Sequence, residues 1–346
     1  MFPVIAMPRT VESVLIVAVN WIGDTIMALP AVQAFRAAHP HAHITVMAKP
    51  GILPLWEAHV VPDSRIEFLS GTHGTWQTIQ LVRSSGPYDR VFILPNSFRS
   101  ALIPWLAGVR PRIGLAGHGR RWLLTQPVDP MPGPERPHQS VEYAHLLLGA
   151  NRPTSLPAPQ LSVSHAETQE IDSLVCDLPR PLIGLIPGAA RGPSKQWPRE
   201  RFIETGQRLS HDDSMGIVVI GSSAERPLCE EIARDIGVGA RAIAGRTNLQ
   251  QWLALLASCD VVVANDSGAM HVAAALGVGV VAIFGITDPV QTGPLGNRVV
   301  ILQKSTERNR DIPRISEAAT AALAAVQPDE VCVAIHQLLV QKGSAV

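Results

Sequence analysis

The first residue in the chain that could do chemistry is Asp24, which follows an apolar run at residues 14–19 and a single glycine, Gly23. A dinucleotide-binding turn would place several glycines here, so that the backbone could approach a pyrophosphate at a helix N-terminus. A carboxylate at this position would repel a phosphate. Asp24 is therefore suited to take a proton from a substrate as a general base, or it simply favours the dipole of the helix that it begins.

A cationic loop follows the apolar run at residues 182–186. Its sequence, PGAARGPSKQWP, contains Gly188, Ser194 and Lys195. Lysine is a mobile point charge suited to a phosphate, and the serine hydroxyl with free backbone amides would complete an anion-binding loop. The alternative is a solvated lysine in an ordinary surface loop.

A second loop, NDSGAMHVAAALG, follows the apolar run at residues 261–264. We expect Asp266 and Ser267 to cap the next helix, Gly268 to let a ligand approach, and His271 to lie one turn further on. A helix N-terminus of this kind is a ready anion site, and the alternative is a plain N-cap with a packed histidine. The two loops together could hold a diphosphate. A diphosphate site in the second half of the chain, with a general base such as Asp24 in the first half, is typical of a glycosyltransferase.

Further polar residues carry weaker indications. Glu225, after residues 216–220, could accept hydrogen bonds from ribose hydroxyls or could favour a helix dipole. The first half contains four arginines that could contact the carboxylates or phosphates of an acidic glycolipid: Arg99, Arg112, Arg120 and Arg121. Equally, these arginines could be scattered over a solvated surface.

The elements that must position these residues alternate between strand-like runs and amphipathic segments, which predicts an α/β fold with parallel sheets. In the first half we expect strands at 14–19, 43–48, 65–69 and 90–94, and helices at 25–38, 75–84, 98–107 and 140–148. In the second half we expect strands at 182–186, 216–220, 261–264 and 280–284, and helices at 201–209, 225–235, 249–258 and 269–276.

Two irregular, proline-rich stretches interrupt this pattern. One lies between residues 118 and 137, and the other, NRPTSLPAPQLSVS, is typical of a linker. We therefore predict two doubly wound, Rossmann-like domains facing each other across a cleft. Residues 1–165 would bind the acceptor and residues 166–346 the nucleotide sugar, with a last helix able to pack back on the first domain.

Composition excludes several other classes of protein. The 346 residues have a formal net charge of +0 and only 17% are charged, so nothing global attracts nucleic acid. The four cysteines lie far apart without CxxC spacing, and we expect buried, reduced thiols without a metal or disulfide role. The N-terminal run MFPVIAMPRT is too short for a signal peptide, and no segment has the about 18 apolar residues of a membrane span. We expect a soluble, cytoplasmic protein, which leaves peripheral contact with the inner face of the inner membrane open.

Four motifs, WIGDTIMALP, LPNSFRSAL, PGAARGPSKQWP and NDSGAMHVAAALG, together resemble the lipopolysaccharide heptosyltransferases of glycosyltransferase family 9. The pairing of the second and fourth motifs is most similar to the heptosyltransferase II branch. The resemblance spans residues 14–285. It implies a GT-B architecture, an ADP-heptose donor, inversion at the anomeric carbon, a lipid A–Kdo core acceptor, and neither a cofactor nor a metal.

The same resemblance implies roles for individual residues. Asp24 corresponds to the general base, and Lys195 to the lysine that binds the phosphates. Asp266, Ser267, Gly268 and His271 correspond to the donor-site loop. Together with the residues considered above, the expected donor-binding residues are Gly188, Ser194, Lys195, Glu225, Asp266, Ser267, Gly268, Met270 and His271. Apart from the resemblance, the polar residues of the first half lead us to expect acceptor binding by Asn96, Arg99, Arg120 and Arg121. Two departures concern Ala190 and Arg191, where relatives usually have an acidic or small residue and then an aromatic residue or glycine, and Asn20, which replaces a common serine.

The expected activity is transfer of heptose from ADP-heptose to the heptose/Kdo inner core of lipopolysaccharide. Heptosyltransferase I, or a family 9 transferase with another sugar or acceptor, is the nearest alternative. A nicotinamide-dependent oxidoreductase is disfavoured because the first turn lacks GxGxxG. A non-catalytic nucleotide-sugar-binding protein is disfavoured because both Asp24 and Lys195 are present.

Overall fold

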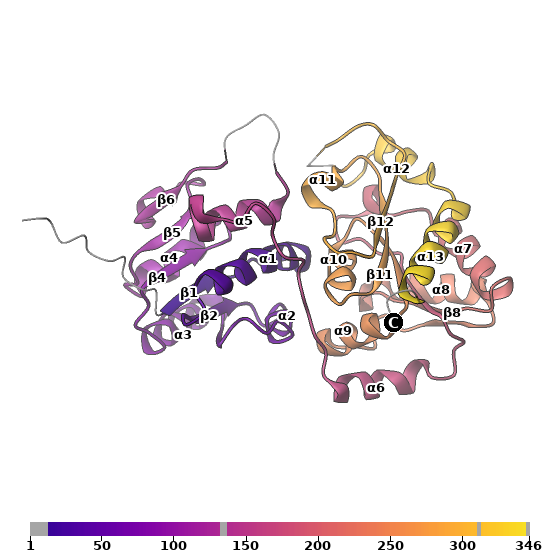
Figure 1. Ribbon diagram of the computed structural model, residues 1–346, viewed down its shortest axis with the longest axis horizontal. Coiled ribbons are helices and arrows are strands. Elements are labelled where there is room, and N and C mark those ends of the chain that lie inside the picture. Colours follow the sequence, from indigo (N-terminus) through magenta and orange to yellow (C-terminus); the bar gives the residue numbers. More distant parts are fainter. Residues whose placement is uncertain (1–12, 132–136, 310–312, 344–346) are drawn as a thin grey trace, which may run out of the picture. The chain divides into compact units, whose positions relative to one another are not determined.

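Two parallel sheets organise the chain in the computed structural model, which describes residues 13–131, 137–309 and 313–343. The N-terminal run MFPVIAMPRT and residues 132–136 of the first irregular stretch lie outside the described residues. The chain divides into two compact units (Figure 1). Unit 1 comprises residues 1–20, 30–135 and 140–157, and unit 2 comprises residues 21–29, 136–139 and 158–346.

Unit 1 contains a six-stranded parallel sheet in the order β3-β2-β1-β4-β5-β6. Its strands are β1 (Ser13–Val17), β2 (His43–Ala48), β3 (Ser64–Glu67), β4 (Arg90–Ile93), β5 (Arg112–Leu115) and β6 (Gln126–Val128). Its helices are α1 (Ile22–Ala38), whose first turns belong to unit 2, α2 (Leu53–Glu57), α3 (Gly71–Ser84), α4 (Phe98–Leu106), α5 (Gln139–Leu148) and the short 3₁₀ turns η1 (Arg121–Leu123) and η2 (Gly149–Asn151). The central strands are apolar almost throughout because helices cover both faces of such a sheet. Phe35 of α1 packs edge-on against Phe92 of β4, with ring centroids 5.4 Å apart.

Unit 2 repeats this topology in a second six-stranded parallel sheet, β12-β11-β10-β7-β8-β9. Its strands are β7 (Leu182–Ile186), β8 (Gly216–Val219), β9 (Ala240–Ala242), β10 (Val261–Asn265), β11 (Gly279–Phe284) and β12 (Val299–Gln303). Its helices are α6 (His165–Val175), α7 (Arg199–His211), α8 (Arg226–Ile236), α9 (Leu249–Ser258), α10 (Gly268–Ala275), α11 (Pro289–Thr292), α12 (Glu317–Ala324) and α13 (Pro328–Gly343), with 3₁₀ turns η3 (Pro193–Lys195) and η4 (Ser223–Glu225). In both sheets the first strand lies in the middle, and the strand order reverses beside it.

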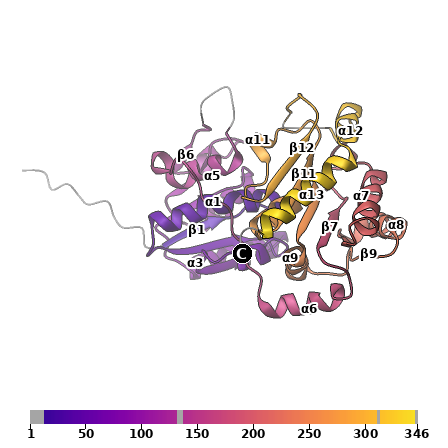
Figure 2. The same cartoon turned by 45° about the vertical axis from the view of Figure 1, so that its right-hand side comes forward.

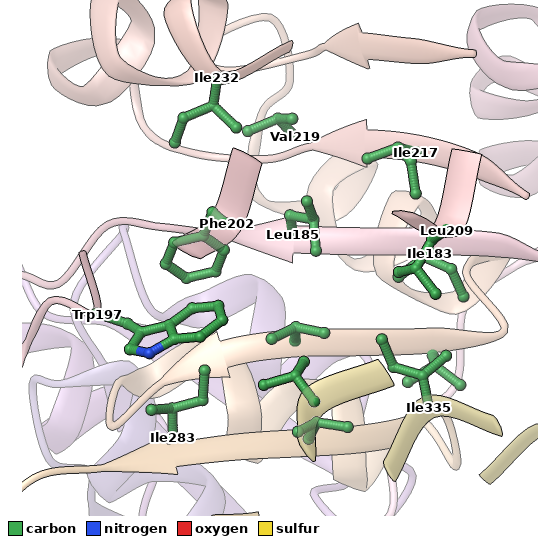
Figure 3. Close-up of a cluster of buried hydrophobic side chains, with 14 of the residues drawn as sticks. Ile183, Leu185, Trp197, Phe202, Leu209, Ile217, Val219, Ile232, Ile283 and Ile335 are labelled. Carbon is green, nitrogen blue, oxygen red and sulfur yellow. The ribbon is translucent and has the colours of Figure 1, made fainter. Parts of the chain in front are cut away.

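The core of unit 2 lies between its sheet and helices α7, α8 and α13. Figure 2 shows α13 lying across the strands β11 and β12. Trp197 is 2% exposed and packs edge-on against Phe202 of α7, with ring centroids 4.9 Å apart (Figure 3). The indole N–H of Trp197 donates to the carbonyl of Val326 at 3.1 Å. This buried anchor fixes the end of the loop that carries Lys195.

The α/β class with two doubly wound parallel sheets is confirmed, and each expected strand and helix is present. The ends of β2, β7 and α9 are those expected, and the ends of the others are shifted by a few residues. The short strands β5, β6 and β9, together with β12 and helices α2, α6, α11 and α12, were not predicted. The expected last helix is present as α13. The predicted domain boundary at residue 165 stays a prediction. Cys229 and Cys259 are buried as expected, whereas Cys176 is exposed, so its predicted burial is wrong.

In the described part of the chain, no single helix is long and apolar enough to cross a membrane. The pair α12 and α13, bent by 60° at their junction, meets that criterion by length and composition only when taken together.

Candidate active site

The candidate site of unit 2 lies where its strand order reverses, between β7 and β10. Ligands of doubly wound sheets bind beyond the carboxyl ends of the strands at such a point. The loop after β7 carries Gly188, Ser194 and Lys195, and the loop after β10 carries Asp266 and the start of α10. The topology therefore brings the two predicted anion-binding loops to one edge of the sheet.

Lys195 and Asp266 form an ion pair that joins these loops. Their side chains are 12% and 9% exposed, so the pair is largely removed from water. Asp266 also accepts a hydrogen bond from the Thr287 hydroxyl at 2.7 Å. The Lys195 ammonium is thus held at the switch point, where it can donate to a phosphate oxygen as well as to Asp266.

Asn265 is a site residue that the sequence analysis missed. It is fully buried at the last position of β10, where its amide oxygen accepts a hydrogen bond from the backbone N–H of Trp197 at 2.9 Å. Its amide nitrogen donates to the Pro187 carbonyl at 2.8 Å. One side chain therefore fixes both ends of the Lys195 loop. The signal in the sequence was a polar residue ending the otherwise apolar run VVVAN.

The N-terminus of α10 has no side-chain cap, which corrects the expectation that Asp266 and Ser267 would cap it. Asp266 is instead engaged with Lys195 and Thr287, and the Ser267 hydroxyl is buried without a hydrogen-bond partner among the described residues. The Ser194 hydroxyl is likewise buried without a hydrogen-bond partner among the described residues. Buried donors normally find partners, and the first N–H groups of a helix have none within it. Both hydroxyls and these amides are consequently suited to an anion.

Two predicted donor residues, Met270 and His271, lie in the interior. Met270 is 0% exposed, so its side chain offers no surface to a ligand, and only its backbone N–H in the first turn of α10 could contribute. His271 is 4% exposed, and burial lowers its pKa to about 4, an effect that Asp266 opposes. His271 is therefore neutral at pH 7 and acts as a packing residue, the alternative reading of this loop.

Glu225 and Gly188 lie against each other. One carboxylate oxygen of Glu225 accepts from the backbone N–H of Ser222 at 2.8 Å and from its hydroxyl at 2.7 Å, which closes a capping box. A Cβ on Gly188 would lie 1.8 Å from the other oxygen of Glu225. The absence of a side chain at Gly188 thus leaves room for this carboxylate beside the end of β7, where it can accept further hydrogen bonds.

Asp24 lies in the first turn of α1, within unit 2. The Gln139 amide donates to its Oδ1 at 3.2 Å. The preceding Gly23 packs against the start of α10, because a Cβ there would lie 3.2 Å from the His271 Cδ2 and 3.6 Å from the Gly268 Cα. The structure therefore brings the predicted base and the predicted anion-binding helix N-terminus together inside one unit.

The acceptor residues predicted in unit 1 are not all at its surface. Arg120 is 0% exposed and donates to the carbonyls of Pro95, Ser97 and Leu115, to the Ser100 hydroxyl and to the Asn96 amide oxygen. Burial lowers its pKa to about 10. The expectation that Arg120 contacts an acceptor is wrong for this structure, because backbone carbonyls occupy its guanidinium. It serves as a brace between two loops.

The other candidates of unit 1 differ in exposure. Arg112 is also buried and donates to the carbonyls of Leu123 at 2.6 Å and Val109 at 2.7 Å. The surface carries Asn96, Arg99 and Arg121. Arg99 donates to the Thr75 hydroxyl at 3.0 Å, and these three residues stay predicted acceptor contacts.

No group of three or more His, Cys, Asp or Glu side chains among the described residues could hold a metal ion. The chemistry that the site can perform with its own residues combines an anion-binding loop, a helix N-terminus and a carboxylate. The fold and this site define a doubly wound α/β protein in which a carboxylate, Asp24, lies in the same unit as a helix N-terminus that is suited to an anion.

Comparison with known proteins names the family. The model of glycosyltransferase family 9 (heptosyltransferase) matches residues 77–319, and the chain belongs to this family of glycosyltransferases. Lipopolysaccharide heptosyltransferase 2 of Salmonella typhimurium is 32% identical over 355 residues, covering 95% of this chain and 99% of that relative. Lipopolysaccharide heptosyltransferase 2 of Escherichia coli is 32% identical over 349 residues, covering 95% of this chain and 99% of that relative. The solved structure of E. coli ADP-heptose lipopolysaccharide heptosyltransferase II has a TM-score of 0.84 at 30% identity, covering 96% of this chain and 100% of that chain.

Proposed function

We propose that this glycosyltransferase moves heptose from ADP-heptose to the heptose/Kdo inner core of lipopolysaccharide, as a heptosyltransferase II. The observation that carries the proposal is the similarity, over nearly the full length of both chains, to proteins named for this activity. The ion-paired lysine and the uncapped start of α10 support it, because they suit the diphosphate of such a donor.

In the proposed reaction, the acceptor hydroxyl attacks the anomeric carbon of heptose from the face opposite the diphosphate. The new oxygen–carbon bond forms as the bond to the ADP oxygen breaks, which inverts the anomeric centre. Asp24 takes the hydroxyl proton, with Gln139 orienting one of its oxygens. Lys195 and the first amides of α10 stabilise the negative charge that develops on the departing ADP.

Glu225 and Gly188 would lie on the nucleoside side of this donor site, where a carboxylate suits ribose hydroxyls. Asn96, Arg99 and Arg121 would contribute to acceptor binding from unit 1. Because the acceptor is anchored by lipid A, we further propose that the protein works in the cytoplasm at the inner face of the inner membrane.

The deciding experiment offers ADP-heptose to the purified protein with lipid A–Kdo cores that carry no heptose or one heptose, and measures ADP release and product mass. We expect transfer to the core with one heptose, and transfer that is slower by about 10² to 10⁴ with Asp24→Asn. Transfer to the heptose-free core alone would favour heptosyltransferase I, the second candidate. Absence of transfer to either core, with ADP binding retained, would refute the proposal.

A further inference from the structure

Three aromatic side chains are exposed side by side on unit 1. Phe98 begins α4, Trp105 lies in its last turn, and Trp122 lies in η1. They are 42%, 40% and 62% exposed, and the Trp122 ring lies 5.9 Å from each of the other two ring centroids. We call them the aromatic cluster. Large apolar side chains that gather on a surface mark an interaction site more often than single ones do.

The chain around the aromatic cluster is strongly basic. Residues 90–128 contain six arginines and no aspartate, glutamate or lysine, although the whole chain has a net charge of +0. Arg112 and Arg120 are buried, and the other four arginines are at least partly exposed. Arg99 and Arg121, which adjoin Phe98 and Trp122 in sequence, are exposed. The nearest acid to Arg121 is Asp129 at 3.9 Å, and with side chains 69% and 85% exposed this pair is weak. The cluster therefore suits a partner with negative charge.

The buried Arg120 gives the aromatic cluster a fixed geometry. Its guanidinium donates to Ser97, which precedes α4, and to Leu115, at the end of β5. Phe98 follows Ser97 directly, and η1, which contains Trp122, follows Arg120 itself. A binding surface held by such a brace loses little conformational freedom when it engages a partner. The buried guanidinium of Arg120 thus has a structural role, which is to hold the segments that carry the aromatic cluster.

We propose that the aromatic cluster, with Arg99 and Arg121, docks on a bilayer surface that contains anionic lipid. Aromatic rings favour the boundary between headgroups and acyl chains, and arginines favour anionic headgroups, so their combination matches such a surface. The inference deepens the proposed function, since a lipid-anchored acceptor is met at a membrane. It identifies the part of the chain that makes the contact.

The test is co-sedimentation of the full chain with vesicles of phosphatidylglycerol and phosphatidylcholine, or of phosphatidylcholine alone. We expect preferential binding to the anionic vesicles, which weakens as salt is raised. Trp105→Ser with Trp122→Ser should weaken this binding roughly tenfold or more, because the rings lose apolar contact with lipid. Arg121→Gln should weaken it about fivefold. Val238→Ser, at a 91% exposed position of unit 2, is the matched control and should bind as wild type does.

Melting temperatures show whether each variant folds, and Trp122→Ser alone replaces the double variant if that one does not. The inference is overturned if the wild-type chain does not bind anionic vesicles, if binding survives loss of the rings, or if light scattering shows that the rings join two copies of the chain instead. The vesicles contain neither donor nor acceptor. A failed binding test would therefore overturn this inference alone, and a failed transfer assay would overturn the proposed function alone.

Discussion

Replacing Lys195 with Met should remove both stability and donor affinity, because its ammonium is the counterion of a nearly buried carboxylate. The side chains of Lys195 and Asp266 are 12% and 9% exposed. Loss of one partner of a buried pair costs about 3–5 kcal/mol. The Thr287 hydroxyl still donates to Asp266 at 2.7 Å. We therefore expect Lys195→Met to lower the free energy of unfolding at pH 7 by about 3 kcal/mol, the lower end of this range.

Urea unfolding of Lys195→Met, Asp266→Asn and the double variant measures this coupling. The double variant should be less destabilised than the sum of the single ones, by about 0.5–3 kcal/mol. Calorimetry with ADP should show an affinity loss of about tenfold or more for Lys195→Met, since charged hydrogen bonds contribute about 1.5–3 kcal/mol. An unfolding free energy within about 0.5 kcal/mol of wild type would refute the ion-pair argument, and unchanged ADP affinity would refute the donor assignment.

Three further predictions concern other sites. Asp24→Asn should lower turnover by about 10² to 10⁴ while ADP affinity stays near wild type; turnover within a few-fold of wild type at saturating substrates would exclude Asp24 as the base. Arg120→Ala should destabilise unit 1 by about 3 kcal/mol or more, because several buried carbonyls lose their donor, whereas Arg121→Ala should change the melting temperature little; equal effects would contradict the burial of Arg120. Burial lowers the pKa of His59 from 6.5 to about 4. Between these two pH values the unfolded state therefore binds more protons than the folded state. The free energy of unfolding falls as the pH drops through this window, by at most about 1.4 kcal/mol per pH unit. His59→Gln should flatten this fall in the urea midpoint, and an equally steep fall would disprove the attribution.

The sequence predicted the central strands well because they are buried on both faces. β7 is the apolar run LIGLI and β10 is the run VVVAN, which is apolar up to its final asparagine, so the loops that follow could be located from them. The edge strands β6 and β9 have three residues each and are only partly buried. Such strands carry no long apolar run or clear alternation, so periodicity could not reveal them.

Local sequence could not show the direction in which a polar side chain points. Arg120 and Arg121 are adjacent residues of the same type, yet one is 0% exposed and the other has a side chain that is 69% exposed. The difference arises because carbonyls from two loops, including those of Ser97 and Leu115, converge on the first guanidinium. Convergence of segments distant in sequence is tertiary information, so composition and spacing assigned both arginines one role.

The single glycine before Asp24, Gly23, is explained by helix packing and not by the approach of a phosphate. A Cβ on Gly268 would lie 3.1 Å from the Gly23 nitrogen, so glycine at both positions lets the starts of α1 and α10 approach closely. Helix N-termini carry partial positive charge, and two of them side by side repel each other unless a negative charge lies near. The Asp24 carboxylate would supply one such charge and a bound diphosphate another. The dipole role and the general-base role of Asp24 are therefore compatible, and Asp24→Asn should cost about 0.3–1 kcal/mol of stability whether or not it is the base. Turnover at saturating substrates, rather than stability, is the measurement that separates the two roles.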